Sequence, residues 1–325
     1  MTSSVVHMGW PRVGLLGNPS DLYRGRVIGF TFDDFAAYAS LSAAESTRLV
    51  GPGGAELRPT DRLEPAAGSG GTELVAAALA ELKAFAPESV DWLARPFELE
   101  VGSTIPRQVG LAGSSAIVVA CLRSLAEHFE VELSDFDCSE LALRAETVQL
   151  GATAGPQDRV LQSYRGLMYM DFSEPRRDDR YQRLEGTSIR LPDLLIAYNP
   201  EPGEDSGKVH SEVHARWEAG EAKVRAGVAR FSEIAAQGLD DLRRGNLQSF
   251  CDGIDANLEA RCALWDVAPR DLEIAAAARA AGAAAKLCGS GGALVIVPRP
   301  GVAFAAVEAA LERTGWSVFE PAVFY

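Results

Sequence analysis

One short loop of small residues constrains the local fold of this chain more than any other feature. The loop VGLAGSSA, residues 109–116, follows a segment of strand-forming residues at 97–106. After the loop, apolar side chains recur at helical spacing, as at Ile117, Cys121 and Leu125, and continue to Phe129. The sequence therefore predicts a strand, a tight glycine-containing loop and a helix that follows directly after the smallest residues.

Two interpretations of this loop stay open. The first turn of a helix leaves backbone N–H groups unpaired and is electropositive, so small residues there let a phosphate approach closely. The same residues also suit an ordinary serine cap after a glycine turn. The loop by itself favours neither interpretation.

Length and charge narrow the classes of function. The chain has 325 residues, more than one hydrophobic core usually serves, which predicts two domains or lobes. Its formal net charge is −14, with only 31 lysine and arginine residues, so the sequence predicts neither a nucleic-acid partner nor a membrane surface as partner. Any positive contact to an anionic substrate must then be local and specific.

Targeting and redox features indicate a cytoplasmic protein. The first residues lack the basic start and apolar core of a signal peptide, and no apolar run reaches the roughly 20 residues of a membrane helix. The five cysteines are scattered and form no CxxC pair, and the four histidines offer no zinc-type spacing. The sequence therefore predicts reduced thiols and no structural metal.

Hydrophobic periodicity predicts a mixture of strands and helices, which is typical of an α+β fold. The predicted strands cover residues 12–17, 25–32, 36–42, 97–106, 166–172, 193–199, 293–298 and 317–324. The predicted helices cover residues 72–86, 117–129, 139–151, 155–166, 270–286 and 302–315, with a further set between residues 208 and 265. Residues 51–71 are expected to form a loop, and the charged residues 173–186 a surface connection between two lobes.

One familiar phosphate motif is excluded. Residues 203–209, GEDSGKV, follow a predicted strand and resemble a Walker loop, but three residues separate the glycines where four are required. Val209 stands where serine or threonine must bind magnesium, and Glu204 and Asp205 would repel a triphosphate. This segment is therefore not predicted to be a P-loop.

Four loops that are far apart in sequence carry a family resemblance. They read PRVGLLGNPSD at 11–21, VGLAGSSA at 109–116, GPQDRV at 155–160 and KLCGSGGA at 286–293. In this order and spacing the chain resembles the GHMP kinases over essentially its whole length, and its loops are most similar to those of the glucuronokinase branch. The resemblance implies a two-lobed α+β fold with the site in the cleft between the lobes. Residues 1–185 would form an ATP-binding lobe with the fold of a ribosomal-protein second domain, and residues 186–325 a ferredoxin-like lobe.

The resemblance implies an ATP- and Mg²⁺-dependent sugar kinase that phosphorylates the anomeric hydroxyl of D-glucuronate, giving glucuronic acid 1-phosphate and ADP. Two alternatives stay open. One is a kinase for another uronic acid or aldose, such as galacturonate, because discrimination of a single hydroxyl lies outside what these motifs report. The other is a catalytically silent sensor of the same fold that binds sugar and nucleotide. The oligomeric state is not readable from the sequence.

The resemblance also implies roles for individual residues. Asp158 matches the family's catalytic aspartate, the base for the anomeric hydroxyl, and Arg12 matches the cation expected beside it. Ser115 matches a serine that contributes to magnesium binding, with Ser114 as the alternative, and Glu146 lies near the position of a magnesium carboxylate. Without the resemblance, the two carboxylates and Arg12 would be interpreted as surface residues.

The remaining implied contacts concern the two substrates. The nucleotide-binding residues would be Gly110, Leu111, Ala112, Gly113, Ser114, Ser115, Ala116, Gly289, Ser290 and Gly291, although a plain glycine helix stop also suits the last three. The sugar-binding residues would be Asn18, Ser20, Asp21, Arg26, Arg107, Gly155 and Asp158. Galactokinase-type relatives carry Glu-His-x-Asp where this chain has residues 18–21, which argues against galactose. A uronate carboxylate suits a guanidinium, and the choice among Arg24, Arg26, Arg107 and Arg159 stays open.

Overall fold

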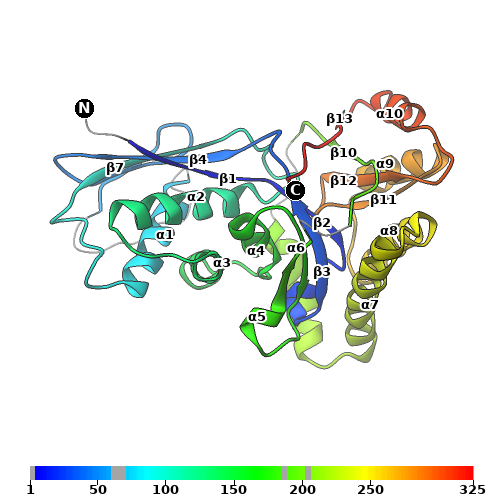
Figure 1. Ribbon diagram of the computed structural model, residues 1–325, viewed down its shortest axis with the longest axis horizontal. Coiled ribbons are helices and arrows are strands. Elements are labelled where there is room, and N and C mark those ends of the chain that lie inside the picture. Colours follow the sequence, from blue (N-terminus) through cyan, green and yellow to red (C-terminus); the bar gives the residue numbers. More distant parts are fainter. Residues whose placement is uncertain (1–3, 60–70, 185–188, 202–205, 325) are drawn as a thin grey trace. The chain divides into compact units, whose positions relative to one another are not determined.

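The computed structural model describes residues 4–59, 71–184, 189–201 and 206–324 (Figure 1), with residues 178 and 206–211 described by their main chain only. Contacts divide the chain into two compact units. The first unit comprises Met1–Pro11, Phe35–Ile105 and Ala112–Arg165. The second unit comprises Arg12–Asp34, Pro106–Leu111 and Gly166–Tyr325. The lobe boundary predicted at residues 185–186 lies outside the described residues, so it stays a prediction.

The first unit has one sheet covered by helices. The sheet runs in the order β1-β4-β7-β5-β6, and its described strand pairs are antiparallel except β5 with β7. Its strands are β1 (Val5–Gly9), β4 (Ala37–Ala43), β5 (Arg48–Val50), β6 (Glu56–Leu57) and β7 (Phe97–Ser103). Its helical elements are α1 (Thr72–Phe85), α2 (Gly113–His128), α3 (Asp135–Arg144), the π-helical turn η2 (Ala145–Gln149) and α4 (Gln157–Tyr164). Helix α2 packs on β1 and β4, and α1, α3 and α4 pack against α2.

Small residues and one glutamine fix the start of α2 in the first unit. Gly9, at the end of β1, approaches the helix backbone so closely that a Cβ there would lie 2.0 Å from the carbonyl oxygen of Ala116. Gln162 on α4 donates hydrogen bonds to the carbonyl oxygens of Trp10 and Ala112, over 3.0 and 2.8 Å. The first turn of α2 is therefore positioned by β1 on one side and by α4 on the other.

The described residues of the second unit form two four-stranded antiparallel sheets, in the orders β2-β3-β8-β9 and β11-β12-β10-β13. Its strands are β2 (Arg12–Leu16), β3 (Arg26–Thr31), β8 (Leu167–Asp171), β9 (Tyr181–Arg183), β10 (Leu195–Tyr198), β11 (Ala283–Leu287), β12 (Ala293–Pro298) and β13 (Ser317–Phe319). Its helical elements are η1 (Ser20–Tyr23), α5 (Arg177–Arg180), α6 (Ser206–Glu218), α7 (Ala222–Arg244), α8 (Leu247–Leu264), α9 (Pro269–Ala280) and α10 (Phe304–Glu312). Helix α7 packs on β3, whereas α8 packs on both β2 and β11.

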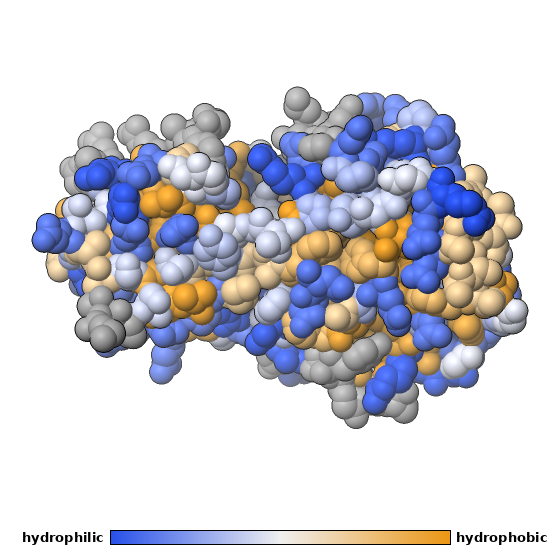
Figure 2. All heavy atoms as spheres, turned by 90° about the horizontal axis from the view of Figure 1, so that it is seen from above, coloured by the Kyte–Doolittle hydropathy of each residue, from blue (hydrophilic) through white to orange (hydrophobic). Residues whose placement is uncertain are grey.

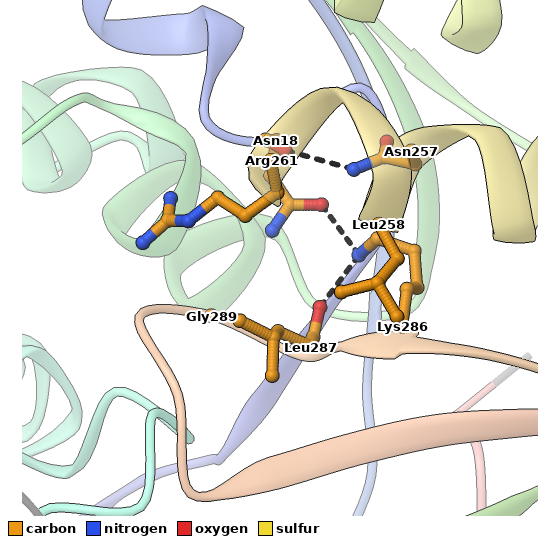
Figure 3. A pocket seen from close by; sticks show the side chains of 7 residues that line it. All are labelled: Asn18, Asn257, Leu258, Arg261, Lys286, Leu287 and Gly289. Atoms are coloured by element: carbon orange, nitrogen blue, oxygen red, sulfur yellow. Dashed lines mark hydrogen bonds between the residues drawn. The ribbon is translucent and has the colours of Figure 1, made fainter. Parts of the chain in front are cut away.

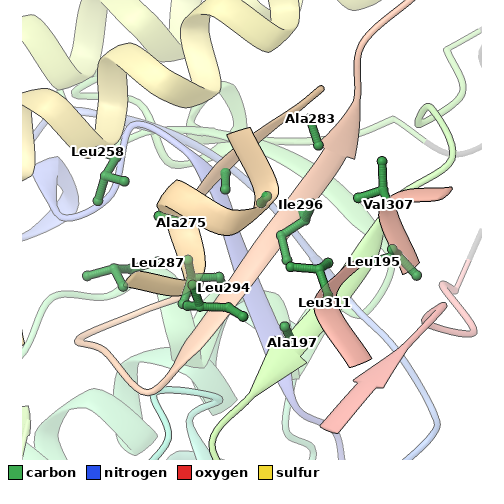
Figure 4. Close-up of a cluster of buried hydrophobic side chains, with 13 residues drawn as sticks. Leu195, Ala197, Leu258, Ala275, Ala283, Leu287, Leu294, Ile296, Val307 and Leu311 are labelled. Atoms are coloured by element: carbon green, nitrogen blue, oxygen red, sulfur yellow. The ribbon is translucent and has the colours of Figure 1, made fainter. Parts of the chain in front are cut away.

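Strand β11 separates an apolar core from a polar site by simple alternation. Ala283, Ala285 and Leu287 share one face of the strand and join the buried cluster drawn in Figure 4, which includes side chains of α8, α9, α10 and β12. Since side chains alternate between the faces of a strand, Lys286 lies on the opposite face. It is nevertheless only 1% exposed. A buried lysine therefore faces away from the apolar core.

The predicted α+β class is confirmed, and so are most of the predicted elements. The helix predicted at 72–86 is α1, and the strand predicted at 97–106 is β7. One helix prediction is wrong: residues 270–286 are split between α9, which ends at Ala280, and the strand β11. Gly282 interrupts the alanine-rich run with a φ of 86°, and pairing with β12 then outweighs the helix propensity of the alanines.

Several shorter elements, among them β1, β6, α5 and β9, were not expected from the sequence. Strand β1 lies in the N-terminal segment, and β6 lies within the predicted loop at 51–71, of which residues 60–70 are not described. The charged connection predicted at 173–186 contains α5 and β9. The final predicted strand, 317–324, is shortened to the three residues of β13. Such short elements lack the periodicity on which a sequence prediction depends.

The described surface carries few large apolar side chains. Those that are exposed are Val6, Met8, Phe85, Leu93, Val148 and Leu272. The face shown in Figure 2 mixes hydrophilic and hydrophobic residues. Within the described ranges, no helix is both long and apolar enough to cross a membrane.

Candidate functional site

The start of α2 in the first unit has the properties of an anion-binding turn. The residue that caps the helix is Ala112, whose left-handed φ of 61° turns the chain into the helix and whose side chain makes no capping hydrogen bond. Ser114 and Ser115 lie inside the first turn, so the serine-cap interpretation of the loop is wrong. The first N–H groups of a helix lack partners within the helix. Because the Ala112 side chain does not cap them, and no other side chain of the described residues is bonded to them, they can bind an anion at the positive end of the helix dipole.

A buried carboxylate lies beside this turn, within the same unit. The Ser115 hydroxyl donates a hydrogen bond of 2.9 Å to Oε2 of Glu146, and both side chains are buried. Glu146 is carried by the π-helical turn η2, a rare conformation that often marks functional positions. The same Oε2 accepts a 2.5 Å hydrogen bond from Nε of Arg159. The oxygens of Ser115 and Glu146 are therefore brought together, as the sequence predicts.

Helix α4 places Asp158 next to this pair. Asp158 lies in the first turn of α4, where a carboxylate is favoured by the helix dipole. Its Oδ2 is 3.6 Å from an Arg159 guanidinium nitrogen, and the same nitrogen donates over 2.9 Å to the carbonyl oxygen of Gly155. Arg159 thus connects the carboxylates of Glu146 and Asp158. Because its guanidinium is committed to these internal acceptors, Arg159 is poorly suited to the substrate carboxylate for which it was a candidate.

Two glycine loops meet in the second unit. A Cβ on Gly110 would lie 2.6 Å from the carbonyl oxygen of Gly291, and a Cβ on Gly289 would lie 2.4 Å from the carbonyl oxygen of Gly110. Only glycine allows the loops at 109–111 and 288–292 to approach this closely. Arg12 lies beside them and donates a 2.6 Å hydrogen bond to the Gly110 carbonyl oxygen. The first part of the phosphate-loop sequence and the third glycine motif are therefore in contact, together with Arg12.

The loop at 17–21 is braced by its own side chains. The Ser20 hydroxyl donates to the carbonyl oxygen of Arg26 over 2.8 Å, and Asp21 is buried. Arg26 donates a 2.6 Å hydrogen bond from Nε to Asp171 on the neighbouring strand β8. Burial raises the pKa of Asp171, but the hydrogen bonds from Ser173 and Arg26 outweigh it and hold that pKa below its usual value. Arg26 therefore already has an anionic partner.

The sequence did not indicate two residues that hold this loop. Asn257 on α8 accepts a 2.7 Å hydrogen bond from the Gly17 amide and donates one of 3.2 Å to the Asn18 carbonyl oxygen. Lys286 donates to the Asn18 side-chain oxygen over 2.7 Å and to the Gly14 carbonyl oxygen over 2.6 Å. The available signal is a lone lysine in an alanine-rich run, but the alanines favour a helix there.

The predicted site residues thus form two clusters, one in each unit. The cluster of the first unit holds Ser115, Glu146, Gly155 and Asp158. The cluster of the second unit holds Arg12, Asn18, Gly110, Gly289, Ser290 and Gly291. Arg107 belongs to neither cluster, and it is exposed without a hydrogen bond or ion pair to any described residue. Since Arg12 and Asp158 lie in different units, their predicted pairing stays a prediction.

Comparisons with known proteins identify relatives along most of the chain. The family described as GHMP kinases N terminal domain matches residues 73–166. The chain is 35% identical over 306 residues to probable glucuronokinase 2 of Arabidopsis thaliana, a match that covers 89% of this chain and 83% of that protein. It is 32% identical over 320 residues to glucuronokinase 1 of the same organism, covering 91% and 85%. The crystal structure of Lactococcus lactis galactokinase complexed with galactose shares the fold, with a TM-score of 0.82 and 16% identity over 99% of this chain and 94% of that one.

Proposed function

The chain belongs to the GHMP kinase family, in the branch of the glucuronokinases, and from this premise we propose that it phosphorylates the anomeric hydroxyl of D-glucuronate. It is a sugar kinase, a phosphotransferase with an alcohol group as acceptor. The proposed reaction consumes ATP and gives glucuronic acid 1-phosphate and ADP. The proposal draws its substrate from the names of the two relatives and its chemistry from the residues of the two clusters.

The observation that carries the proposal is the uncapped first turn of α2 beside the buried Ser115–Glu146 pair. Phosphoryl transfer is mainly positioning and charge stabilisation, so a kinase needs donors for phosphate oxygens and a site for the metal that accompanies the nucleotide. The first-turn N–H groups from Gly113 onward supply the donors. The contact of Gly289 with Gly110 supports a role of the third motif in bracing the same loop.

The residues at this turn suit Mg²⁺. Hydroxyl and carboxylate oxygens are the ligands that Mg²⁺ prefers, and Ser115 and Glu146 offer one of each. The described contacts of the Glu146 carboxylate all fall on Oε2, so within the described residues its Oε1 is open to a cation. When bound with ATP, Mg²⁺ neutralises charge on the phosphate oxygens. We propose Ser115 and Glu146 as its protein ligands.

Asp158 is the proposed base. The anomeric oxygen forms a bond to the γ-phosphorus of ATP, the bond from that phosphorus to the β,γ-bridging oxygen breaks, and Asp158 accepts the hydroxyl proton. Asp158 lies in the first turn of α4, and its Oδ2 is 3.6 Å from an Arg159 guanidinium nitrogen. Arg12, which is buried and donates to the phosphate-loop carbonyl of Gly110, is proposed to contribute positive charge to the same reaction.

A substrate panel tests the proposal. Purified protein with ATP and Mg²⁺ is assayed for ADP release with glucuronate, galacturonate, galactose and glucose. We expect release with glucuronate and loss of release in Asp158→Asn, with nucleotide binding retained. ADP release with another uronic acid but not with glucuronate would assign that acid as the substrate. Near-normal turnover of Asp158→Asn would refute the role of Asp158 as the base. ATP and sugar binding without any turnover would instead identify a silent sensor.

A further inference from the structure

A small pocket in the second unit has four polar side chains in its lining. Its polar lining residues are Asn18, Asn257, Arg261 and Lys286, and Leu258, Leu287 and Gly289 complete it (Figure 3). Among the residues that the structure describes, no carboxylate lines it. Arginine only donates and the asparagine amides can donate, whereas Lys286 is already bonded to internal acceptors, so this lining favours a ligand that only accepts.

Arg261 is the cation of this pocket, and no carboxylate of the described residues is paired with it. It lies on α8, is 4% exposed, and its Nε makes no hydrogen bond within the described residues. One terminal nitrogen donates to the carbonyl oxygen of Ser290 over a long 3.4 Å, and the guanidinium lies 4.6 Å from the centre of the Trp265 ring. Burial lowers its pKa to about 10, so the group is still charged at neutral pH. A buried charge with unmet donors is costly unless an anion pairs with it.

The amide of Asn18 is turned to present a second donor. Asn257, four residues before Arg261 on the same face of α8, holds the backbone of the loop at Gly17 and Asn18. Lys286 donates to the Asn18 side-chain oxygen, and its other two hydrogen bonds, of 2.6 Å each, go to the carbonyl oxygens of Gly14 and Leu287. The Asn18 amide nitrogen is therefore directed away from Lys286, as Figure 3 shows, and it has no partner among the described residues.

We propose that this pocket binds the carboxylate of the sugar acid, with Arg261 as the principal cation and the Asn18 amide as the second donor. The inference rests on the proposed function and adds the residue that distinguishes a uronic acid from a neutral sugar. A carboxylate has two acceptor oxygens and no donor, which matches the lining of the pocket. Arg26 and Arg159, by contrast, are already paired with internal carboxylates.

The test compares glucuronate with glucuronamide, whose neutral amide has nearly the same shape. KM and kcat are measured for both sugars and for ATP in the wild type, Arg261→Gln, and Arg313→Gln as a control on an exposed arginine of the same unit. We expect Arg261→Gln to raise the KM for glucuronate about 10- to 100-fold, the size of a lost hydrogen bond to a charged group. Its kcat and its KM for glucuronamide and ATP are expected to stay within a few-fold of the wild type.

Three results would overturn the pocket assignment while leaving the proposed function intact. The first is an unchanged KM for glucuronate in a folded Arg261→Gln protein. The second is an Arg261→Gln protein whose KM for ATP is raised while its KM for glucuronate is unchanged, which would assign the pocket to a nucleotide phosphate. The third is a raised KM for glucuronate in Arg107→Gln only. If the wild type phosphorylates no uronic acid, the proposed function and the inference both fail.

A second variant keeps the inference testable if Arg261→Gln does not fold. Asn18→Asp has nearly the same shape, keeps an oxygen acceptor for Lys286 and replaces the donor by a negative charge. We expect it to weaken glucuronate binding at least as much as Arg261→Gln, and to bind glucuronamide better than glucuronate. Folding is checked by circular dichroism and thermal unfolding. An Asn18→Asp protein that binds glucuronate as the wild type does would contradict the inference.

Discussion

The hydroxyl of Ser115 and the carboxylate of Glu146 lie 2.9 Å apart, although the two residues are 31 positions apart in the chain. One belongs to the first turn of α2 and the other to the π-helical turn η2. Both are buried, and the carboxylate is also bound by Arg159. An oxygen pair held in this way at a helix start is the feature on which the proposed metal site depends.

Glu146→Gln tests the metal site. Glutamine keeps the size of the side chain but removes the charge that a hard cation needs, so we expect kcat/KM to fall by about 100-fold or more. The Mg²⁺ concentration for half-maximal activity should also rise, and titration of activity with Mg²⁺ measures it. Glu132→Gln, at an exposed glutamate of the same unit, is the control and should match the wild type. A Glu146→Gln enzyme with unchanged Mg²⁺ dependence would exclude Glu146 as a ligand.

Arg159→Met tests the structural role of the guanidinium between the two carboxylates. Removing one partner of a buried ion pair leaves an uncompensated charge, so we expect the free energy of unfolding to fall by about 3–5 kcal/mol. Urea denaturation measures it. Arg230→Met breaks an exposed pair with Glu233 and should cost less than about 1 kcal/mol. Equal effects of the two substitutions would contradict the buried role of Arg159.

Two glycine substitutions are expected to have opposite effects. Gly289→Ala places a Cβ 2.4 Å from the Gly110 carbonyl oxygen, which forces the loops apart and should cost about 1–3 kcal/mol and raise the KM for ATP. At Gly253, within α8, the nearest atoms to a Cβ are 3.9 Å away, so Gly253→Ala should stabilise the protein by up to about 1 kcal/mol. Thermal unfolding and ATP kinetics check both. If Gly253→Ala lost stability while Gly289→Ala did not, the contrast between the open position at Gly253 and the crowded position at Gly289 would be refuted.

The buried Lys286 predicts a pH dependence of stability. Burial lowers its pKa to about 7, whereas the unfolded chain has the usual lysine value of about 10.4. Between these values the unfolded state binds a proton that the folded state does not, so this group makes stability rise with pH, by at most about 1.4 kcal/mol per unit. Below pH 7 both states bind the proton, so this dependence ends there. Urea denaturation from pH 6 to 10 should show this rise in the wild type relative to Lys286→Met, and parallel curves would contradict it.

The sequence was informative where local pattern decides the structure. Helix α2 and strand β7 follow from periodicity, and the glycine loop between them follows from composition. Strand β11 was missed because alanine favours a helix locally, while its actual conformation comes from pairing with β12, a long-range contact that no window contains. Tertiary pairing therefore decided this segment.

The candidate site divides in a similar way. Motif positions such as Ser115 and Glu146 were predicted and lie together. The bonding state of an arginine cannot be read from a motif, so Arg159 was a substrate candidate although it binds Glu146. The sequence does not indicate Arg261 as a site residue. Its role depends on its burial on α8 next to the loop at Asn18. Hydrophobic periodicity does not show that a single polar residue of a helix is buried.

The central claim is that this kinase places a phosphate on the anomeric oxygen of glucuronate. The most direct measurement is NMR of the product made from ATP and glucuronate labelled with carbon-13 at C1. We predict that the phosphorus signal of the sugar phosphate is coupled to the labelled C1 and that the product has lost its reducing end. A phosphate attached to any other carbon, or no phosphorylated sugar acid in the presence of ATP and Mg²⁺, would contradict the account.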